Sequence, residues 1–306
     1  MPLAHLLIIL LINLSWGSSF LTIKYNVVHF GPYFSLALRY LVLTLPLLPF
    51  LGRVPVGSLK PLVLVGTLMG VFHFGLGMTA FHLAADLASL AIAAQLYIPL
   101  AALLAVWFLK EQVTWPTLAG VALAFSGIAV MSFDPLIFTQ LDSLFAMIVS
   151  ALVLAVCSLI IRSRLGPLHP LTLQAWIGLC GFLPILLLSC LVEERQWERL
   201  VSATWINWGS VLHVILFSSI LGHGMNFWLL QRQPISRVTP YYLLTPLIGV
   251  LMAVIFWGDT PGARVWFGGA GILGGVALVS WADILKRRSR TKAAPVDDSV
   301  PGEASL

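Results

Sequence analysis

The most regular feature of the chain is a series of long apolar stretches separated by short polar segments. A transmembrane helix needs about 20 mostly apolar residues, and ten stretches of the sequence meet that requirement. They lie at residues 3–23, 32–51, 61–82, 87–109, 115–133, 143–161, 170–192, 207–230, 236–257 and 263–283. The pattern therefore predicts an all-α membrane protein with ten transmembrane helices.

The composition supports the membrane class. Hydrophobic residues make up 59% of the chain and charged residues 9%, which is too apolar for a water-soluble domain. No Lys or Arg precedes the first stretch and nine more follow it, so we expect a retained helix rather than a signal peptide. The three cysteines lie in apolar stretches and are odd in number, which favours packing over a disulfide framework.

The sequence repeats itself. Proline and glycine positions coincide at separations of 138, 147 and 148 residues, in the pairs Pro32 and Pro170, Pro99 and Pro246, Gly77 and Gly224, Gly120 and Gly268, and Gly127 and Gly275. We therefore predict two repeats, residues 1–135 and 136–285, each with five helices. Because five is odd, the second repeat crosses the membrane in the opposite sense to the first. The predicted fold is two inverted five-helix repeats.

The distribution of charge predicts the orientation. The net charge of +5 is spread along the loops and does not indicate nucleic-acid binding. With the N-terminus in the cytoplasm, 12 Lys and Arg residues fall on the cytoplasmic side and four on the outer side. This bias predicts that both termini are cytoplasmic. Residues 286–306 begin with basic residues and end in a polar sequence, so we expect a disordered basic cytoplasmic tail.

Inverted repeats point to a transporter. In secondary transporters the substrate site lies near the middle of the membrane between the repeats, and movement of one repeat against the other gives alternating access. The chain contains no Walker motif for ATP binding. Energy would come from an ion gradient, from exchange or from the substrate gradient, and His73 and His223 are the best candidates for proton coupling.

Three segments carry a resemblance to a known family. LRYLVLTLPLLPF (38–50), LASLAIAAQLYIPLAALLAVWFLKEQVTW (87–115) and the run that begins LLTPLIGVLMAVIFWGD (243–259) resemble EamA-type transporters of the drug/metabolite transporter superfamily. The resemblance implies ten helices, a central cavity lined by the first four helices of each half, and export of amino acids or related metabolites across the bacterial inner membrane. The family's Gly-Glu after the ninth helix is Gly258-Asp259 here.

Polar side chains inside the apolar stretches are candidates for binding the substrate. Asn13 and Trp16 share one face of the first stretch, Arg39 is a basic residue deep in the second, and His73 lies in the third. Arg39 would hold a substrate carboxylate or gate the outer mouth. The alternative is structural: Trp16 would lie at the membrane interface, Arg39 would reach the headgroups, and His73 would only hydrogen-bond a neighbouring helix.

The fourth and ninth stretches each contain a proline near polar residues. Pro99 follows Gln95 and Tyr97, and Pro246 follows Tyr242. Proline leaves the carbonyl four residues earlier without its helical donor, and helices interrupted at matching positions indicate a binding site. We predict hinges at Pro99 and Pro246, although each proline would also serve simply to bend its helix.

The eighth stretch is the most polar of the ten. His223 and Asn226 face one way, and Trp228 follows them. We predict that all three bind substrate, the alternative being hydrogen bonds between helices. Gly120 and Gly127, with Gly268, Gly271, Gly274 and Gly275, indicate close helix contacts, and a homodimer is one arrangement that such a stripe would support.

The prediction is a secondary transporter that exports small polar metabolites, such as amino acids or their derivatives, and whose partners are its substrate and membrane lipid. Two alternatives remain at this stage. An intramembrane lipid-modifying enzyme would need clustered catalytic groups, but no HExxH spacing occurs, and Asp86, Glu111 and Asp259 are divided between the two sides. A scaffold without transport would tolerate leucine at every polar position. We expect no catalytic residue, metal or cofactor.

Overall fold

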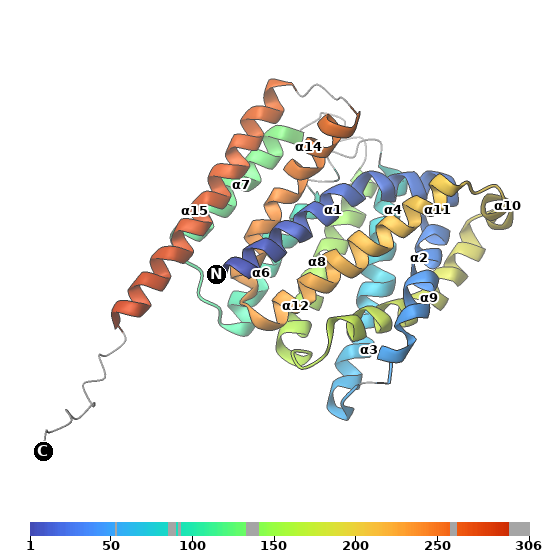
Figure 1. Cartoon of the computed structure of the whole chain (residues 1–306), viewed down its shortest axis with the longest axis horizontal. Coiled ribbons are helices and arrows are strands. Elements are labelled where there is room, and N and C mark those ends of the chain that lie inside the picture. Colours follow the sequence, from blue (N-terminus) through green and yellow to red (C-terminus); the bar gives the residue numbers. More distant parts are fainter. Residues whose placement is uncertain (53, 85–89, 91–92, 133–140, 258–261, 294–306) are drawn as a thin grey trace, which may run out of the picture.

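A computed structural model gives the fold, and it describes the whole chain except residues 53, 85–89, 91–92, 133–140, 258–261 and 294–306. The described residues form helices and the turns between them, without a strand (Figure 1). Eight helices are long and apolar enough to cross a membrane. The all-α membrane class is thus confirmed. Two shorter apolar helices, Ala93–Leu109 and Trp115–Met131, coincide with the other two predicted segments.

The first half of the described chain contains five helical segments. The first is α1 (Leu3–Phe30), and the second is α2 (Pro32–Leu47) with η1 (Leu48–Phe50). The third combines η2 (Val56–Ser58), α3 (Leu59–Thr67), η3 (Leu68–His73) and α4 (Phe74–Leu83), and the last two are α6 (Tyr97–Leu109) and α7 (Trp115–Ser132). Gly31 ends α1 with a φ of 91°, and Pro32 begins α2 at a position where a helix needs no amide donor.

The second half has a similar order. It contains α8 (Leu141–Arg164), α9 (Pro170–Val192), the short α10 (Gln196–Val201), α11 (Trp205–His213) with η5 (Val214–His223) and α12 (Gly224–Arg232), α13 (Ile235–Val238) with η6 (Thr239–Leu244) and α14 (Thr245–Trp257), and α15 (Ala263–Ala293). The predicted disordered tail begins at residue 286, yet α15 continues to Ala293. Lys, Arg and Ala are good helix formers and can extend the helix. Residues 294–306 lie outside the described part.

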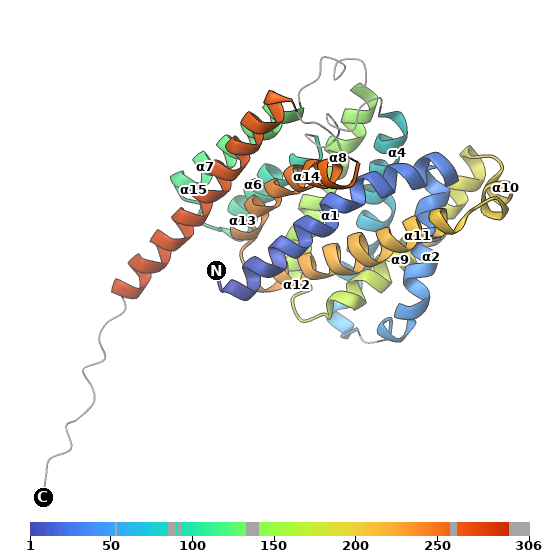
Figure 2. The same ribbon diagram turned by 45° about the horizontal axis from the view of Figure 1, so that its top comes forward.

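α7 and α15 pack against each other at one edge of the molecule (Figures 1 and 2). A methyl group on Gly120 would lie 2.6 Å from the carbonyl oxygen of Gly275, and one on Gly127 would lie 2.5 Å from that of Gly268. The residue numbers of the contacting glycines increase along α7 and decrease along α15, so the two helices run antiparallel. These glycines are used within the chain, which removes the observation on which the homodimer prediction was based.

Contacts between helix ends mark the two ends of the molecule. At one end, His5 at the start of α1 packs against Trp228, and Arg162 donates to the carbonyl of Gln231. At the other end, Lys24 donates to the carbonyls of Phe81 and Ala84. We call these the N-terminal end and the Lys24 end. Arg162 and Arg232, two of the residues predicted to be cytoplasmic, lie at the N-terminal end.

Several helices change their hydrogen-bond pattern near the middle of the bundle. The segments η3 and η5 are π-helical, and η6 is a 3-10 helix. η3 follows α3 in the first half and η5 follows α11 in the second, so the third helix of each predicted repeat contains a π-helical segment. Such segments are rare and often occur at functional sites.

Candidate functional site

A cavity of about 160 Å³ lies in the middle of the helix bundle. It is enclosed by α1, α2, η3, α4, α6, α8, η5, η6 and α14, so both halves of the chain contribute to its wall. Seven of the ten residues predicted to bind substrate line it: Trp16, Arg39, His73, Gln95, Tyr97, His223 and Tyr242. We call it the central cavity.

Arg39 extends from α2 into this cavity and is only 4% exposed. Its Nε–H donates to the hydroxyl of Ser219 at 2.9 Å, and its guanidinium carbon lies 4.6 Å from the centre of the Phe74 ring. Gln174 donates to the carbonyl of Ser219 and so holds the same segment of η5 in place. Among the described residues, no carboxylate lies within ion-pair distance of Arg39. The guanidinium is therefore a buried cation that faces a cavity.

Aromatic rings surround the polar middle of the cavity. The ring of Trp16 lies 5.1 Å from that of His223 and 5.0 Å from that of Tyr242, and Phe74 lies 5.1 Å from His223. The indole nitrogen of Trp16 and the Nδ1 atom of His223 are buried without a hydrogen-bond partner in the described part of the chain. The Trp16 nitrogen lies against Gly222, where a Cβ atom would collide with it, and Gly222 does not line the cavity. A ligand that reached His223 would offer its Nδ1 atom the hydrogen bond that buried polar groups normally make.

His73 and Tyr97 are held by serines of α8. The Nδ1 atom of His73 lies 2.8 Å from the hydroxyl of Ser150 and 3.0 Å from its carbonyl oxygen, and that hydroxyl also donates to the His73 carbonyl. The Tyr97 hydroxyl lies 3.1 Å from that of Ser158. Neither Ser150 nor Ser158 could be predicted from the sequence, because an isolated serine in an apolar helix is common.

Asn13 and Asn226 lie behind the cavity wall and support it. Thr245 donates to Asn13 at 2.7 Å, and the Tyr242 hydroxyl donates to Asn226 at 2.7 Å. Both asparagines are fully buried, and the side-chain nitrogen of Asn226 has no partner among the described residues. Asn226 thus orients Tyr242 and does not itself line the cavity.

Trp228 lies away from the cavity. Its ring packs against His5 at a centroid distance of 5.3 Å, and the guanidinium of Arg232 covers it at 4.2 Å. The residue therefore belongs to the N-terminal end of the molecule, two residues beyond Asn226.

Pro99 and Pro246 lie where regular helix begins again. Pro99 is the third residue of α6, after a turn at Leu96, and Pro246 is the second residue of α14, directly after the 3-10 helix η6. Proline is tolerated in the first turn of a helix because the first amides have no helical acceptor. Both halves of the chain thus contain an interrupted helix beside the cavity.

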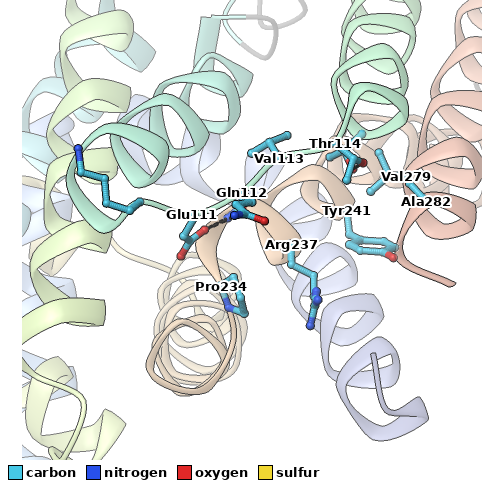
Figure 3. Close-up of a pocket in the computed structure, with 12 residues that line it drawn as sticks. Glu111, Gln112, Val113, Thr114, Pro234, Arg237, Tyr241, Val279 and Ala282 are labelled. Carbon is cyan, nitrogen blue, oxygen red and sulfur yellow. Dashed lines mark hydrogen bonds between the residues drawn. The ribbon is translucent and has the colours of Figure 1, made fainter. Parts of the chain in front are cut away.

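A second pocket, of about 360 Å³, lies at the N-terminal end, between the loop after α6, the start of α13 and helix α15 (Figure 3). Lys110 ends α6 in a left-handed conformation with a φ of 56°. The carboxylate of the next residue, Glu111, accepts hydrogen bonds from the amides of Ile235 and Ser236, at 3.0 and 2.9 Å, and from the Ser236 hydroxyl. Glu111 thereby caps α13 and fastens the loop after α6 to it.

A similar contact occurs at the Lys24 end. Glu193, directly after α9, accepts hydrogen bonds from the amides of Tyr33 and Phe34 at the start of α2, at 2.9 and 2.8 Å. Gly31 leaves room for this carboxylate, because a Cβ atom there would lie 2.5 Å from it. Charge-assisted bonds of this kind are among the stronger hydrogen bonds in proteins. Asp259, the repeat counterpart of Glu111, lies outside the described residues, as does Asp86.

The described residues contain no group of three or more His, Cys, Asp or Glu side chains that could hold a metal ion. What the central cavity offers is one buried cation, several uncharged hydrogen-bonding groups and an aromatic wall. This arrangement suits reversible binding of a small anionic or zwitterionic molecule.

Comparison with known proteins agrees with this geometry. The sequence profile of the EamA-like transporter family matches residues 3–133 and again residues 142–281. A probable amino-acid metabolite efflux pump of Salmonella typhimurium is 28% identical over 290 residues, which cover 92% of this chain and 96% of the relative. A protein of the same description from Escherichia coli is 25% identical, over 80% of this chain and 84% of the relative.

Two further comparisons extend the picture. A probable terminal-alkyne amino-acid exporter of Streptantibioticus cattleyicolor is 27% identical over 61% of each chain. A solved crystal structure has a TM-score of 0.73 to this chain with 18% identity, and the match covers 91% of this chain and 98% of the other. That likeness supports the fold.

Proposed function

Because the chain belongs to the EamA-like transporter family, as its sequence motifs predicted, we propose that it is a secondary transporter that exports small polar metabolites by alternating access through the central cavity. Amino acids or their derivatives are the first candidates, since relatives that match most of the chain are described as probable amino-acid metabolite efflux pumps. The family and these descriptions support a transporter over the intramembrane enzyme considered from the sequence. The single observation that carries the proposal is the cavity between the two halves, which is mostly apolar and contains one buried cation and a few uncharged polar groups.

The packing of the helices supports two inverted repeats, residues 1–135 and 136–285. At a separation of 148 residues, Gly120 corresponds to Gly268 and Gly127 to Gly275, but the contacts are crossed: Gly120 meets Gly275, and Gly127 meets Gly268. Crossed contacts between equivalent positions are what a two-fold axis in the plane of the membrane would produce. The family profile also matches the chain twice, at boundaries close to these.

Other helix pairs follow the same rule. α1 packs against α14, and α8, the counterpart of α1, packs against α6, the counterpart of α14. α2 packs against its own counterpart α9. With the two shorter apolar helices counted as crossings, the ten spans would form a bundle in which the fifth and tenth, α7 and α15, lie at the side.

We assign the N-terminal end to the cytoplasm, because the predicted cytoplasmic excess of Lys and Arg lies there. The cavity then extends from the middle of the bundle toward the outer face, where Phe20, Ile23 and Phe81 line it. Toward the cytoplasm, Ile12, Ile98, Phe227 and Leu243 are fully buried and fill the space between the helices. In alternating access, this packed region would open while the outer region closes.

The hydrogen bonds of Glu111 and Glu193 join the two repeats. Each carboxylate belongs to one repeat and accepts from backbone amides of the other, and the two lie at opposite ends of the molecule. Both contacts are formed in this conformation, so under the proposed mechanism each would have to break or adjust when one repeat moves against the other.

Export is tested with purified protein in liposomes of bacterial lipid. Vesicles preloaded with a labelled amino acid should lose it faster with wild-type protein than with Gln95→Leu, which removes a polar group from the cavity wall. Trp228→Leu is the matched control, since it removes a side chain outside the cavity. Equal flux through all three proteins, above that of empty vesicles, would defeat the site assignment, and no flux above empty vesicles for any amino acid would defeat the proposed function.

A further inference from the structure

The charge of the central cavity is positive and unbalanced by the residues that line it. Among the described residues that line it, Arg39 alone carries a permanent charge, and none is Asp or Glu. A buried charge without a counter-ion is costly, so an anionic group of a ligand beside Arg39 would be stabilised. A carboxylate matches the geometry of a guanidinium, which can donate two parallel hydrogen bonds to it.

The wall nearest the Lys24 end is apolar. Phe20 packs against Phe81 at a ring distance of 5.4 Å, and Met78 and Met147 complete this wall beside them. An apolar group in contact with these side chains would gain free energy by leaving water. A charged group would lose its hydration there without finding a partner.

Uncharged polar groups also line the cavity. The side chains of Gln95 and Tyr97 line the same cavity, and an amide or hydroxyl oxygen can accept a hydrogen bond from an ammonium group. These oxygens can accept hydrogen bonds from one ammonium group, the α-ammonium of an amino acid. A second cation on the ligand's side chain would lie against the apolar wall, with Arg39 as the nearest charge.

The volume limits the size of the ligand. About 160 Å³ is close to the roughly 150 Å³ of an engineered apolar cavity that binds benzene. The cavity in this conformation therefore accommodates a molecule of the size of a small or medium amino acid.

From these features we infer that the central cavity selects amino acids with one carboxylate and a small or medium, uncharged, apolar side chain, and that it discriminates against cationic side chains. The carboxylate binds Arg39, and the side chain lies against Phe20, Phe81 and Met147. This inference rests on the proposed function, because it names the substrate class of the same cavity.

Competition measurements in proteoliposomes test the selectivity. Transport of labelled leucine by wild-type protein is measured with valine, lysine and glutamate as competitors, and with 4-methylpentanoate and 3-methylbutylamine, which are leucine without its ammonium and leucine without its carboxylate. Valine and 4-methylpentanoate should compete well. Lysine, glutamate and 3-methylbutylamine should compete about 30-fold more weakly or worse, because each would leave a buried charge without its partner. Lysine as effective as valine would overturn the inference and leave the proposed function intact, whereas transport of no amino acid would overturn both.

Arg39→Gln tests the carboxylate contact directly. This substitution should weaken the binding of leucine about 30-fold or more. In the variant, 4-methylpentanoate should no longer compete better than 3-methylbutylamine. An unchanged advantage in the folded variant would show that Arg39 does not bind the carboxylate.

Gly77→Ala tests the position of the side chain without changing any charge. Gly77 lines the cavity, and a methyl group there would have only the Ser150 hydroxyl within 4 Å, at 3.7 Å, so it fits and narrows the cavity. Binding of leucine should weaken about tenfold relative to alanine. The control is Gly224→Ala at the equivalent position of the second repeat. A methyl group there would lie 3.9 Å from its nearest neighbouring atom, and Gly224 does not line the cavity. An unchanged ratio of leucine to alanine in Gly77→Ala would contradict the assigned orientation.

Discussion

Replacing Gly127 by alanine should push α7 away from α15 and lower the stability of the protein without changing substrate affinity. The new methyl group would lie 2.5 Å from the Gly268 carbonyl oxygen and 2.7 Å from the Ile272 amide nitrogen. Carbon and oxygen atoms in helix interfaces normally lie about 3.3 Å or more apart. Both neighbours are backbone atoms that cannot rotate aside, so the helices would have to separate by several tenths of an ångström.

The expected magnitude follows from two opposing effects. Overpacking of a well-packed contact costs about 1–3 kcal/mol, and alanine gains up to about 1 kcal/mol over glycine in helix propensity. The net loss of about 1–2 kcal/mol would lower the melting temperature by a few degrees in a chain of this size. Substrate affinity should stay the same, because neither α7 nor α15 contributes a residue to the central cavity wall.

Thermal unfolding in detergent, followed by tryptophan fluorescence, measures this effect, and leucine competition in liposomes measures affinity. The matched control is Gly274→Ala on α15, whose methyl group would meet only a Leu123 methyl at an ordinary 3.6 Å. It should unfold at or slightly above the wild-type temperature. If Gly127→Ala and Gly274→Ala unfolded at the same temperature, the close antiparallel contact would be refuted.

Three further substitutions give separate tests. Tyr242→Phe should cost about 1–3 kcal/mol of stability, because the buried Asn226 loses its hydrogen-bond donor. The loss should largely disappear when Asn226 is also replaced by leucine. Additive losses in this double-mutant cycle would argue against the hydrogen bond. Trp228→Leu should leave the transport KM unchanged, and a raised KM would extend the site to α12. Glu111→Gln should cost about 1.5–3 kcal/mol by weakening charge-assisted bonds, seen as a lower melting temperature, and wild-type stability would show that the cap contributes nothing.

Residues whose polarity is costly in lipid could be identified from the sequence. Arg39, His73 and Gln95 interrupt apolar stretches, and each lines the cavity because a buried polar group needs polar surroundings. Asn226 and Trp228 are two residues apart, which places them on different sides of α12. Which neighbouring helices those two sides contact depends on how α12 packs, and the sequence does not show that.

Features that arise from tertiary packing were not visible in the sequence. The glycine pattern predicted close contacts, but the partner of Gly120 depends on the direction in which α15 runs. The π-helical segments η3 and η5 have ordinary apolar sequences, and Ser150, which holds His73, has no local signal. In each case the determining interaction comes from a helix distant in sequence.

The glutamate contacts make the chain unequally sensitive to mutation. The acceptors are two side chains, Glu111 and Glu193, whereas the donors at both faces include main-chain N–H groups, which every residue except proline supplies. Random substitution can therefore remove either contact by a single change at a glutamate, but seldom by a change at Tyr33, Phe34 or Ile235. In a library of variants, defects in coupling between the two halves should concentrate at the two acidic positions.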